Sequence, residues 1–219
     1  GKRFLTGHSN IKVWMIFDVK QSGRRKARLV CGGHLTPPSD DTYYSSVAPL
    51  RSMRIVMFLA ELNGLEICAG DIGNAYLTSY TNEKVTFVAG PEFRDFGHEG
   101  HTMKVIRACY GLRESGSRFH ERLAGVLWSE GFVPSKADPD VWMKDFGDHW
   151  EYICTYVDDL IYAGHNARLF FDNILQSKHG FKLKGVGEPR YHLGGDFRRM
   201  MEPEHMLTWG SKTYVKRMM

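Results

Sequence analysis

The sequence has 219 residues, of which 42% are hydrophobic and 25% charged, and its formal net charge is +4. This length and composition exclude an intrinsically disordered chain and allow a sizeable core, in one domain or two closely joined subdomains. No apolar run approaches the roughly 20 residues of a membrane-spanning helix, so we expect neither membrane association nor a signal peptide. Because the first residue is Gly1, we expect a fragment of a longer protein.

The positive charge is concentrated at the two ends of the sequence. Residues 1–36 hold eight Lys and Arg against one Asp, and residues 178–219 hold nine against four acids, which leaves a net charge of −8 between them. Basic ends around an acidic centre are typical of a protein that binds a polyanion and holds cations at a reaction centre. A solvated surface with uneven charge is the alternative interpretation.

The first predicted elements form a hairpin. Residues 14–19 and 26–31 are rich in β-branched and apolar residues and predict two strands, joined by a turn at residues 21–23 and followed by a loop at residues 32–38. Four cations lie near the tip of this hairpin: Arg24, Arg25, Lys26 and Arg28. Because such closely spaced cations repel one another, we expect them to face solvent or an anion such as a triphosphate.

A helix and a strand are predicted next. Ser52 can cap a helix that ends at residues 63–64 and turns one apolar face inward: Ile55, Leu59 and Leu62. Residues 65–72 predict a strand with Asp71 near its end. Taken alone, Asp71 is better explained by a structural role, in which its carboxylate caps the following turn.

Shorter elements follow. Strands are expected at residues 85–88 and 103–109, and between them a loop at residues 90–101 that includes His98 and His101. A second helix is expected to start at Ser115 or Ser117, to end at Gly131 and to bury Phe119, Leu123, Val126 and Leu127. The remaining predicted elements are a strand at 139–143, a helix from Asn166 to Gly180 with Phe170 and Ile174 on one face, strands at 181–183, 191–194 and 205–208, and a helix from Ser211.

The four cysteines are widely spaced and form no Cys-x-x-Cys pair: Cys31, Cys68, Cys109 and Cys154. This pattern indicates reduced thiols in the core of an intracellular protein rather than disulfides or a zinc site.

The predicted strands and helices are arranged around residues 150–164. In this stretch, two runs of β-branched and aromatic residues flank the adjacent carboxylates Asp158 and Asp159. Two like charges in apolar surroundings are costly unless they are neutralised, and a divalent cation with oxygen ligands is a suitable partner. A solvent-exposed turn with two acids is the alternative. The alternation of helices and strands predicts an α+β fold with helices on one face of a mainly antiparallel sheet. Such a fold sets Asp71 beside this turn, where three carboxylates could hold two metal ions.

Seven short blocks resemble, in order, the motifs of one known family: residues 26–30 (Lys-Ala-Arg-Leu-Val), 71–77 (Asp-Ile-Gly-Asn-Ala-Tyr-Leu), 110–113 (Tyr-Gly-Leu-Arg), 136–139 (Lys-Ala-Asp-Pro), 156–159 (Tyr-Val-Asp-Asp), 191–194 (Tyr-His-Leu-Gly) and 214–216 (Tyr-Val-Lys). On these blocks the sequence from about Val13 to its end is similar to the reverse transcriptase of copia-type (Pseudoviridae) LTR retrotransposons. It departs from that family at residues 32–33, where Gly-Gly stands in place of the Ala-Arg-Gly of many members. It also departs at residues 114–116, where Glu-Ser-Gly replaces Gln-Ala/Ser-Pro, a segment that bears on template or base contacts.

The resemblance implies a right-hand polymerase fold from which the thumb is largely absent. Its subdomains would be fingers at residues 1–46 and 79–114, a ferredoxin-like palm at 47–78 and 115–199, and the start of the thumb or a connecting segment at 200–219. It implies as partners an RNA or DNA template with its primer, deoxynucleoside triphosphates, and the integrase and RNase H of a polyprotein outside this fragment. The implied location is intracellular, in the cytoplasm or in virus-like particles there.

The implied activity is RNA-directed DNA synthesis by two-metal nucleotidyl transfer, with two Mg²⁺ ions that Mn²⁺ could replace. The catalytic and metal-binding residues would be Asp71, Asp158 and Asp159, with the Ile72 carbonyl as a further ligand. The nucleotide would be bound by Arg24, Arg25, Lys26, Arg28, Tyr76 and Tyr110, with Tyr76 as an aromatic gate against ribonucleotides. The template and primer would be contacted by Tyr156, Val157, Gly111, Leu193 and Gly194.

Other functions are weighed beside this one. A non-catalytic nucleic-acid-binding remnant of a retroelement is the main alternative, and the three intact carboxylates argue against it. A cyclase or another nucleotidyl transferase with a palm would lack the basic hairpin and the Tyr-Gly-Leu block. Without the family resemblance, Tyr76 is better explained as a core aromatic residue beside Leu77.

Overall fold

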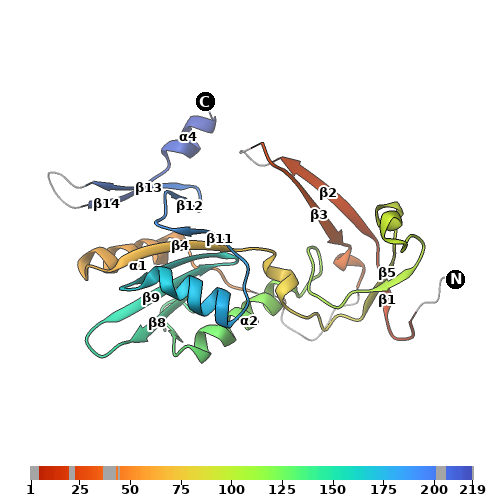
Figure 1. Ribbon diagram of the computed structural model, residues 1–219, viewed down its shortest axis with the longest axis horizontal. Helices are drawn as coiled ribbons and strands as arrows, with labels where there is room; N and C mark the ends of the chain where they lie inside the picture. Colours follow the sequence, from red (N-terminus) through yellow and green to blue (C-terminus); the bar gives the residue numbers. More distant parts are fainter. Residues whose placement is uncertain (1–4, 20–22, 37–42, 44, 201–205, 219) are drawn as a thin grey trace. The chain divides into compact units, whose positions relative to one another are not determined.

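The structure, a computed structural model, describes residues 5–19, 23–36, 43, 45–200 and 206–218 (Figure 1). The chain forms two compact units, each from two stretches of sequence: Gly1–Ser45 with Asn74–Ala124, and Ser46–Gly73 with Gly125–Met219. The division into fingers and palm with the boundaries given above remains a prediction. Most of the predicted turn at residues 21–23 and the loop prolines at 37 and 38 lie outside the described residues.

The first unit contains two small sheets and three 3-10 helices. One sheet is the antiparallel pair β2 (Val13–Val19) and β3 (Arg25–Cys31), as the sequence predicts. The other has the order β1-β5-β6 and consists of β1 (Ser9–Asn10), β5 (Val85–Val88) and β6 (Thr102–Lys104). The 3-10 helices are η1 (Gly33–Leu35), η2 (Ala75–Thr78) and η3 (Pro91–Phe96).

Two predictions for this unit are wrong in part. The strand expected at residues 103–109 ends at Lys104, because the chain then turns to bond the 79–81 segment, where the Ala108 amide donates to the Ser79 carbonyl at 3.0 Å. The loop expected at 90–101 contains η3, whose first residue, Pro91, has the fixed φ that suits a helix start.

The expectation of four reduced cysteines is also wrong, because a disulfide joins Cys31 to Cys109. The two cysteines are 78 residues apart in sequence, so their spacing gives no sign of the bond. They meet because the end of β3 lies along the loop between β6 and α2, where the Cys31 amide donates to the Tyr110 carbonyl at 2.7 Å. Cys68 and Cys154 are free and buried, as predicted.

The second unit is built on a six-stranded antiparallel sheet of order β11-β4-β10-β9-β8-β7 (Figure 1). Its strands are β4 (Glu66–Ile72), β7 (Val133–Pro134), β8 (Val141–Asp145), β9 (Trp150–Tyr156), β10 (Asp159–Gly164) and β11 (Leu183–Gly187). A smaller antiparallel sheet contains β12 (Tyr191–His192), β13 (Gly195–Met200) and β14 (Met206–Gly210). The helices are α1 (Leu50–Leu62), α2 (Ser115–Ser129), which crosses the boundary between the units, α3 (Ala167–Leu169), its π-helical continuation η4 (Phe170–Lys178), and α4 (Lys212–Met218).

Helices cover both faces of the six-stranded sheet, so the prediction of helices on one face is wrong. On one face, α1 packs on Ile67 and Ala69 of β4. On the other face, η4 lies so close that a Cβ on Gly70 would be 2.7 Å from the Phe171 ring. Successive strand residues point to opposite faces, and residues 67–70 are all buried. That unbroken run, rather than an alternation, is typical of a strand covered on both sides.

Helix α1 buries a different face from the predicted one. Its sheet-facing residues are Met53, Val56, Met57 and Ala60. Two residues of the predicted inward face are largely exposed instead, Ile55 at 52% and Leu62 at 68%. Because α1 has apolar residues all round, helical periodicity alone cannot select its buried face. The predicted end at residues 63–64 is confirmed, since Gly64 has a φ of 63° after the last helical residue.

Other helix predictions are confirmed. Helix α2 begins at Ser115 and buries Phe119, Leu123 and Leu127. The third predicted helix is α3 with η4, which ends before Gly180, and the last is α4. In the part of the chain that the structure describes, no helix has the length and apolar composition needed to cross a membrane.

Candidate active site

The adjacent carboxylates Asp158 and Asp159 lie at the turn between two paired strands. β9 ends at Tyr156 and β10 begins at Asp159, and these two residues pair across the hairpin. Val157, between them, has a φ of 54°. A β-branched residue in this left-handed region is strained by about 1–3 kcal/mol, and such strain is found where the surrounding structure fixes the backbone. The turn is therefore a tightly specified feature of the sheet.

Asp71 lies beside this turn, as the sequence predicts. Strands β4 and β10 are antiparallel neighbours, and Asp71 is the cross-strand partner of Asp159. The Ile72 amide donates to the Asp158 carbonyl at 2.8 Å, which extends the pairing past the end of β10. Directly opposite residues of two strands present their side chains on the same face. The fold thus brings together three carboxylates from positions 71, 158 and 159.

The electrostatics of the turn show how crowded its negative charge is. Burial, and then the charges of Asp158 and Asp71, raise the pKa of Asp159 from 3.8 to about 6. A carboxyl group whose charged form is disfavoured in this way gains most from a nearby cation. An all-oxygen donor set of this kind suits Mg²⁺. In the described residues, no three His, Cys, Asp or Glu side chains are already arranged as a metal-binding group. The donors nevertheless fit a divalent cation by their chemistry, since all of them are oxygens.

The Ile72 carbonyl is the further metal ligand that the family resemblance implies beside the three carboxylates. Ile72 is fully buried, and its amide faces the Asp158 carbonyl. In an antiparallel strand the amide and carbonyl of one residue point to the same side. The Ile72 carbonyl therefore also points toward the 158–159 turn.

Lys184 lies next to Asp71 in the sheet, and the sequence did not predict it as part of the site. It is the cross-strand neighbour of Asp71 on β11, on the side away from β10. Its Nζ would be 2.8 Å from a Cβ placed on Gly73, so a side chain at residue 73 would displace the lysine. The strand predicted at residues 181–183 overlaps β11 (Leu183–Gly187) at Leu183 alone and ends one residue before Lys184. The alternation of Lys182 and Lys184 with apolar residues was the signal that could have extended it.

Several residues predicted to bind the nucleotide meet in the first unit. The Tyr76 ring lies 5.2 Å from the Tyr110 ring and 6.3 Å from the Phe119 ring, measured between centroids. The Arg28 guanidinium lies over the Tyr110 ring, 5.7 Å from its centroid. Tyr76 is therefore both a packed aromatic residue, as the alternative interpretation holds, and a direct neighbour of Tyr110, another predicted nucleotide contact.

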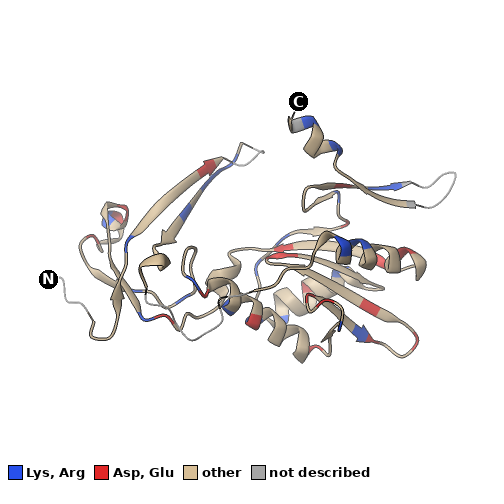
Figure 2. Ribbon diagram, turned by 180° about the vertical axis from the view of Figure 1, so that it is seen from behind, with Lys and Arg blue, Asp and Glu red and all other residues tan. Residues whose placement is uncertain are grey.

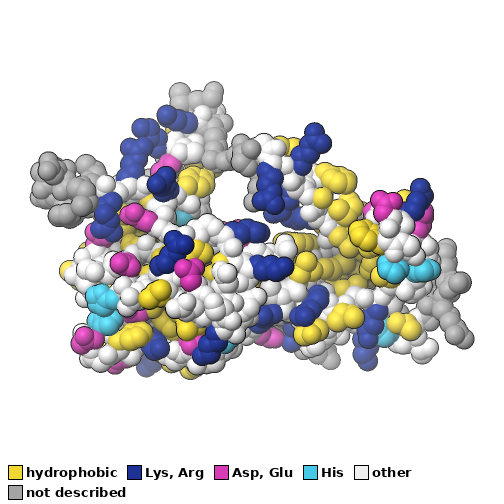
Figure 3. Space-filling model, in the orientation of Figure 1, with side chains coloured by type: hydrophobic (Ala, Val, Ile, Leu, Met, Phe, Trp, Pro, Cys, Tyr) yellow, Lys and Arg dark blue, Asp and Glu magenta, His cyan; other side chains and the backbone are white. Residues whose placement is uncertain are grey.

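The cations of the β2–β3 pair are divided between its two faces. Lys26 and Arg28 are two residues apart on β3 and share one face, whereas Arg25 lies on the other. Arg24 precedes the strand. Arg28 thus lies at Tyr110 with Lys26 on the same face of the strand, whereas Arg25 is on the opposite face. Lys and Arg residues lie along this strand pair and also on β13 and α4 (Figure 2), and Figure 3 shows Lys and Arg side chains on the surface in the orientation of Figure 1.

The residues predicted to contact template and primer lie at turns. Gly111 has a φ of 89°, and a Cβ there would clash with the Cys31 carbonyl oxygen. Leu193 and Gly194 form the turn between β12 and β13 with positive φ values of 46° and 83°. Tyr156 is 38% exposed beside the carboxylates. Gly111, Leu193 and Gly194 therefore depend on backbone geometry that few residue types adopt without strain, whereas Tyr156 is the last residue of β9.

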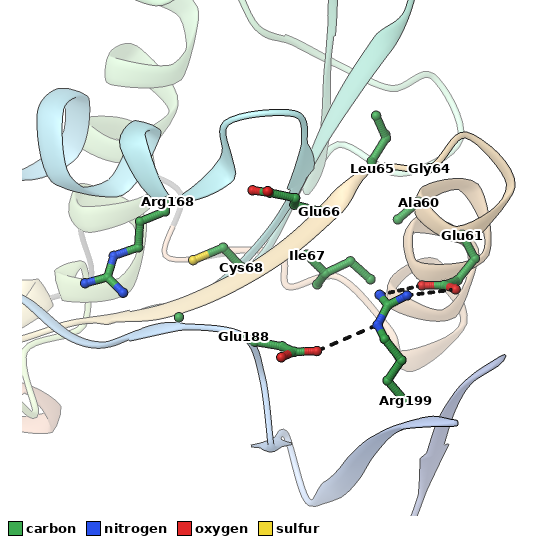
Figure 4. A pocket seen from close by; sticks show the side chains of 11 residues that line it. Ala60, Glu61, Gly64, Leu65, Glu66, Ile67, Cys68, Arg168, Glu188 and Arg199 are labelled. Atoms are coloured by element: carbon green, nitrogen blue, oxygen red, sulfur yellow. Dashed lines mark hydrogen bonds and ion pairs between the residues drawn. The ribbon is translucent and has the colours of Figure 1, made fainter. Parts of the chain in front are cut away.

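A cavity of about 630 Å³ lies at the opposite end of β4 from Asp71 (Figure 4). Its wall includes residues 66–68 of β4, together with Arg168 and Arg199. Arg199 is already neutralised, since its guanidinium lies 2.7 Å from the Glu61 carboxylate and 3.7 Å from that of Glu188. None of the predicted site residues lines this cavity.

Comparison with known proteins agrees with the motifs. Residues 6–218 match the family described as reverse transcriptase (RNA-dependent DNA polymerase). The chain is 29% and 28% identical, over 185 residues, to the retrovirus-related Pol polyproteins from transposons RE1 and RE2 of Arabidopsis thaliana. It is 24% identical over 196 residues to that from transposon TNT 1-94 of Nicotiana tabacum. These matches cover 84–86% of the chain, which spans only 13–15% of the length of those relatives.

Proposed function

Because the chain belongs to the reverse transcriptase (RNA-dependent DNA polymerase) family, with copia-type relatives, we propose that it extends a primer on an RNA or DNA template by two-metal nucleotidyl transfer. The observation that carries this proposal is the register of β4 and β10, which sets Asp71 against Asp159 with Asp158 beside them. In this proposal the second unit is the palm and the first unit the fingers, and the substrates are deoxynucleoside triphosphates.

The chain's own groups have distinct roles in this mechanism. Asp71, Asp158 and Asp159, with the Ile72 carbonyl, would hold two Mg²⁺ ions, or Mn²⁺ in their place. When bound, such ions lower the pKa of the primer 3′-hydroxyl and neutralise the triphosphate and the leaving pyrophosphate. The strand pairing of β4 and β10 orients the carboxylates before substrate arrives, which limits the reorganisation needed during the reaction.

The remaining proposed site residues would bind the nucleotide and the template–primer, and would exclude ribonucleotides. Lys26 and Arg28 would attract the triphosphate from the Tyr110 side of the β2–β3 pair. Tyr76 would occupy the space that a ribose 2′-hydroxyl needs. Overpacking at such a position costs about 1–3 kcal/mol, which corresponds to roughly tenfold to a few hundredfold discrimination. Tyr156, Val157, Gly111, Leu193 and Gly194 would contact the template and primer, whose sequence is read by base pairing.

The larger setting follows from the relatives, which are retrovirus-related Pol polyproteins of transposons. We propose that this chain acts as part of such a polyprotein, beside integrase and RNase H. We propose the cytoplasm as its location, inside virus-like particles. A non-catalytic nucleic-acid-binding remnant is the second candidate. It is favoured by one observation: the described residues hold no ready-made metal-binding group.

Primer extension separates the two candidates. The folded chain is incubated with labelled oligo(dT) on poly(rA), dTTP and Mg²⁺ or Mn²⁺, and binding of the same duplex is measured in parallel. The proposal expects extension that requires the divalent cation. Tight binding of the duplex without extension in either metal would establish the remnant instead.

A further inference from the structure

The 3-10 helix that carries Tyr76 is held at its C-terminal end by two arginines. η2 spans Ala75–Thr78, and the Thr78 carbonyl accepts a hydrogen bond from Nη1 of Arg107 at 3.1 Å. The same carbonyl accepts a closer hydrogen bond from Nη1 of Arg122. Carbonyls at the end of a helical turn lack intrahelical partners and carry partial negative charge, so a guanidinium is a favourable partner there.

Helix α2 supplies both an aromatic residue that packs against the Tyr76 ring, Phe119, and one of these arginines, Arg122. Phe119 meets the Tyr76 ring edge-on, with the centroids 6.3 Å apart. Arg122 follows three residues later, and residues three apart lie on the same side of a helix. One side of α2 therefore contacts η2 at two points, the aromatic ring and the last carbonyl. The Tyr110 ring also packs against the Tyr76 ring, with the centroids 5.2 Å apart.

The placement of Arg122 is electrostatically unfavourable for the arginine itself. Burial, and then the charge of Arg107, lower its pKa. Arg107 is fixed separately, because its guanidinium stacks 3.8 Å above the Tyr80 ring. Two cations meet at one carbonyl here, which indicates that the bond to Thr78 outweighs their repulsion. Hydrogen bonds to charged groups are among the stronger ones in proteins.

We propose that Arg122 is a positioning residue for sugar selection, which fixes the end of η2 and thereby the Tyr76 ring against the 2′ position of the incoming nucleotide. This inference rests on the proposed polymerase function. Arg122 touches neither the substrate nor the reacting atoms in this scheme. Loss of the Arg122 bond removes one of the two guanidinium contacts at the Thr78 carbonyl, which loosens the end of η2 and lets the ring move and admit a 2′-hydroxyl.

The kinetic test compares the ratio of kcat/KM for dTTP over UTP in four proteins. These are the wild type, Tyr76→Ala, Arg122→Met and Arg122→Lys. We expect Tyr76→Ala to lose most of the discrimination and Arg122→Met to lose roughly tenfold, about the factor that one charged hydrogen bond supplies. The loss should appear as a lower KM for UTP, with kcat for dTTP little changed. Arg122→Lys, which keeps a charged donor, should restore part of the ratio.

Arg118→Met is the matched control, since Arg118 lies one turn earlier on α2 and pairs with Glu114 and Glu121 instead. It should leave the ratio unchanged. If Tyr76→Ala does not alter the ratio, the proposal that Tyr76 excludes ribonucleotides is refuted. If Tyr76→Ala alters it and Arg122→Met does not, the gate stands and the role of Arg122 is refuted.

A second measurement does not depend on catalysis. Hydrogen–deuterium exchange is followed for the backbone amides of residues 76–79 in the wild type, Arg122→Met and Arg118→Met. We expect at least a severalfold faster exchange in Arg122→Met, since its anchor to the Thr78 carbonyl is gone, and no change in Arg118→Met. Equal exchange in all three folded proteins would overturn the inference, whether or not the chain extends primers.

Discussion

Replacing Asp159 with Asn should make the folded chain more stable at neutral pH while impairing nucleotidyl transfer. Burial and the neighbouring charges of Asp158 and Asp71 raise the Asp159 pKa from 3.8 to about 6. This shift corresponds to about 3 kcal/mol of unfavourable free energy for the charged form in the folded state. Because the side chain is only partly buried and solvent screens it, we expect about 1–2 kcal/mol of added stability in Asp159→Asn at pH 7.5.

The stabilisation by Asp159→Asn should depend on pH. The folded-state pKa of Asp159 lies above the unfolded value, so the folded chain binds the proton more tightly. The penalty is therefore present in full above pH 6 and disappears as the pH falls toward 4. Urea unfolding at pH 7.5 and pH 4 should show the advantage of Asp159→Asn at pH 7.5 and almost none at pH 4. Added Mg²⁺ should stabilise the wild type more than the variant, because it binds the folded carboxylates.

Asp145→Asn is the control, since Asp145 is an exposed carboxylate in the same sheet, at the end of β8. It should change the free energy of unfolding by no more than about 0.5 kcal/mol at either pH. An Asp159→Asn protein that is less stable than wild type at pH 7.5, or equally stabilised at pH 4, would refute the repulsion between the three carboxylates.

Three further predictions address the hairpin turn, the basic strand and a buried histidine. Val157→Gly should raise stability by about 0.5–1 kcal/mol in urea unfolding, because glycine relieves the positive φ, and a loss of stability would show that the turn is unstrained. Lys26→Ala and Arg28→Ala should each raise the KM for dTTP more than Arg25→Ala does, and equal effects would contradict the division of the strand into two faces. Burial lowers the pKa of His192 to about 4, so the stability it contributes is complete above its ordinary value of 6.5 and lost as the pH falls from there toward 4. This loss, about 3 kcal/mol at most, should be absent in a folded His192→Gln protein, and an unchanged pH profile in that variant would refute the assignment.

Local patterns in the sequence predict well the hairpin that carries Asp158 and Asp159. Asp158 and Asp159 lie between two strand-forming runs, and Asp71 ends another, so an antiparallel sheet brings the three together by register alone. The family blocks then add proposals that spacing cannot supply, such as a role for Tyr76 in excluding ribonucleotides. Here the local preferences and the tertiary structure agree, and for that reason the prediction succeeds.

Features that depend on tertiary contacts could not be predicted in the same way. The buried face of α1 is set by the sheet beneath it, and apolar residues such as Ile55 on its other face made periodicity ambiguous. The Cys31–Cys109 bond joins residues 78 positions apart through a loop contact that no spacing rule indicates. Arg122 bonds the Thr78 carbonyl, and Lys184 is the cross-strand neighbour of Asp71. Both neighbours are distant in sequence, so no local pattern predicts either contact.

The most direct test of the central claim is the rate of single-nucleotide incorporation by Asp158→Asn relative to wild type and Asp145→Asn. Each protein is first shown to be folded by urea unfolding and to bind the poly(rA)/oligo(dT) duplex, and dTTP incorporation is then followed in Mg²⁺. If Asp71, Asp158 and Asp159 hold the ions for nucleotidyl transfer, the Asp158→Asn rate should fall by at least about a thousandfold, as for other interactions made at the reacting phosphate. The Asp145→Asn rate should match that of the wild type. A folded, duplex-bound Asp158→Asn chain that incorporates dTTP within tenfold of the wild-type rate would contradict the assignment of these carboxylates as the catalytic centre.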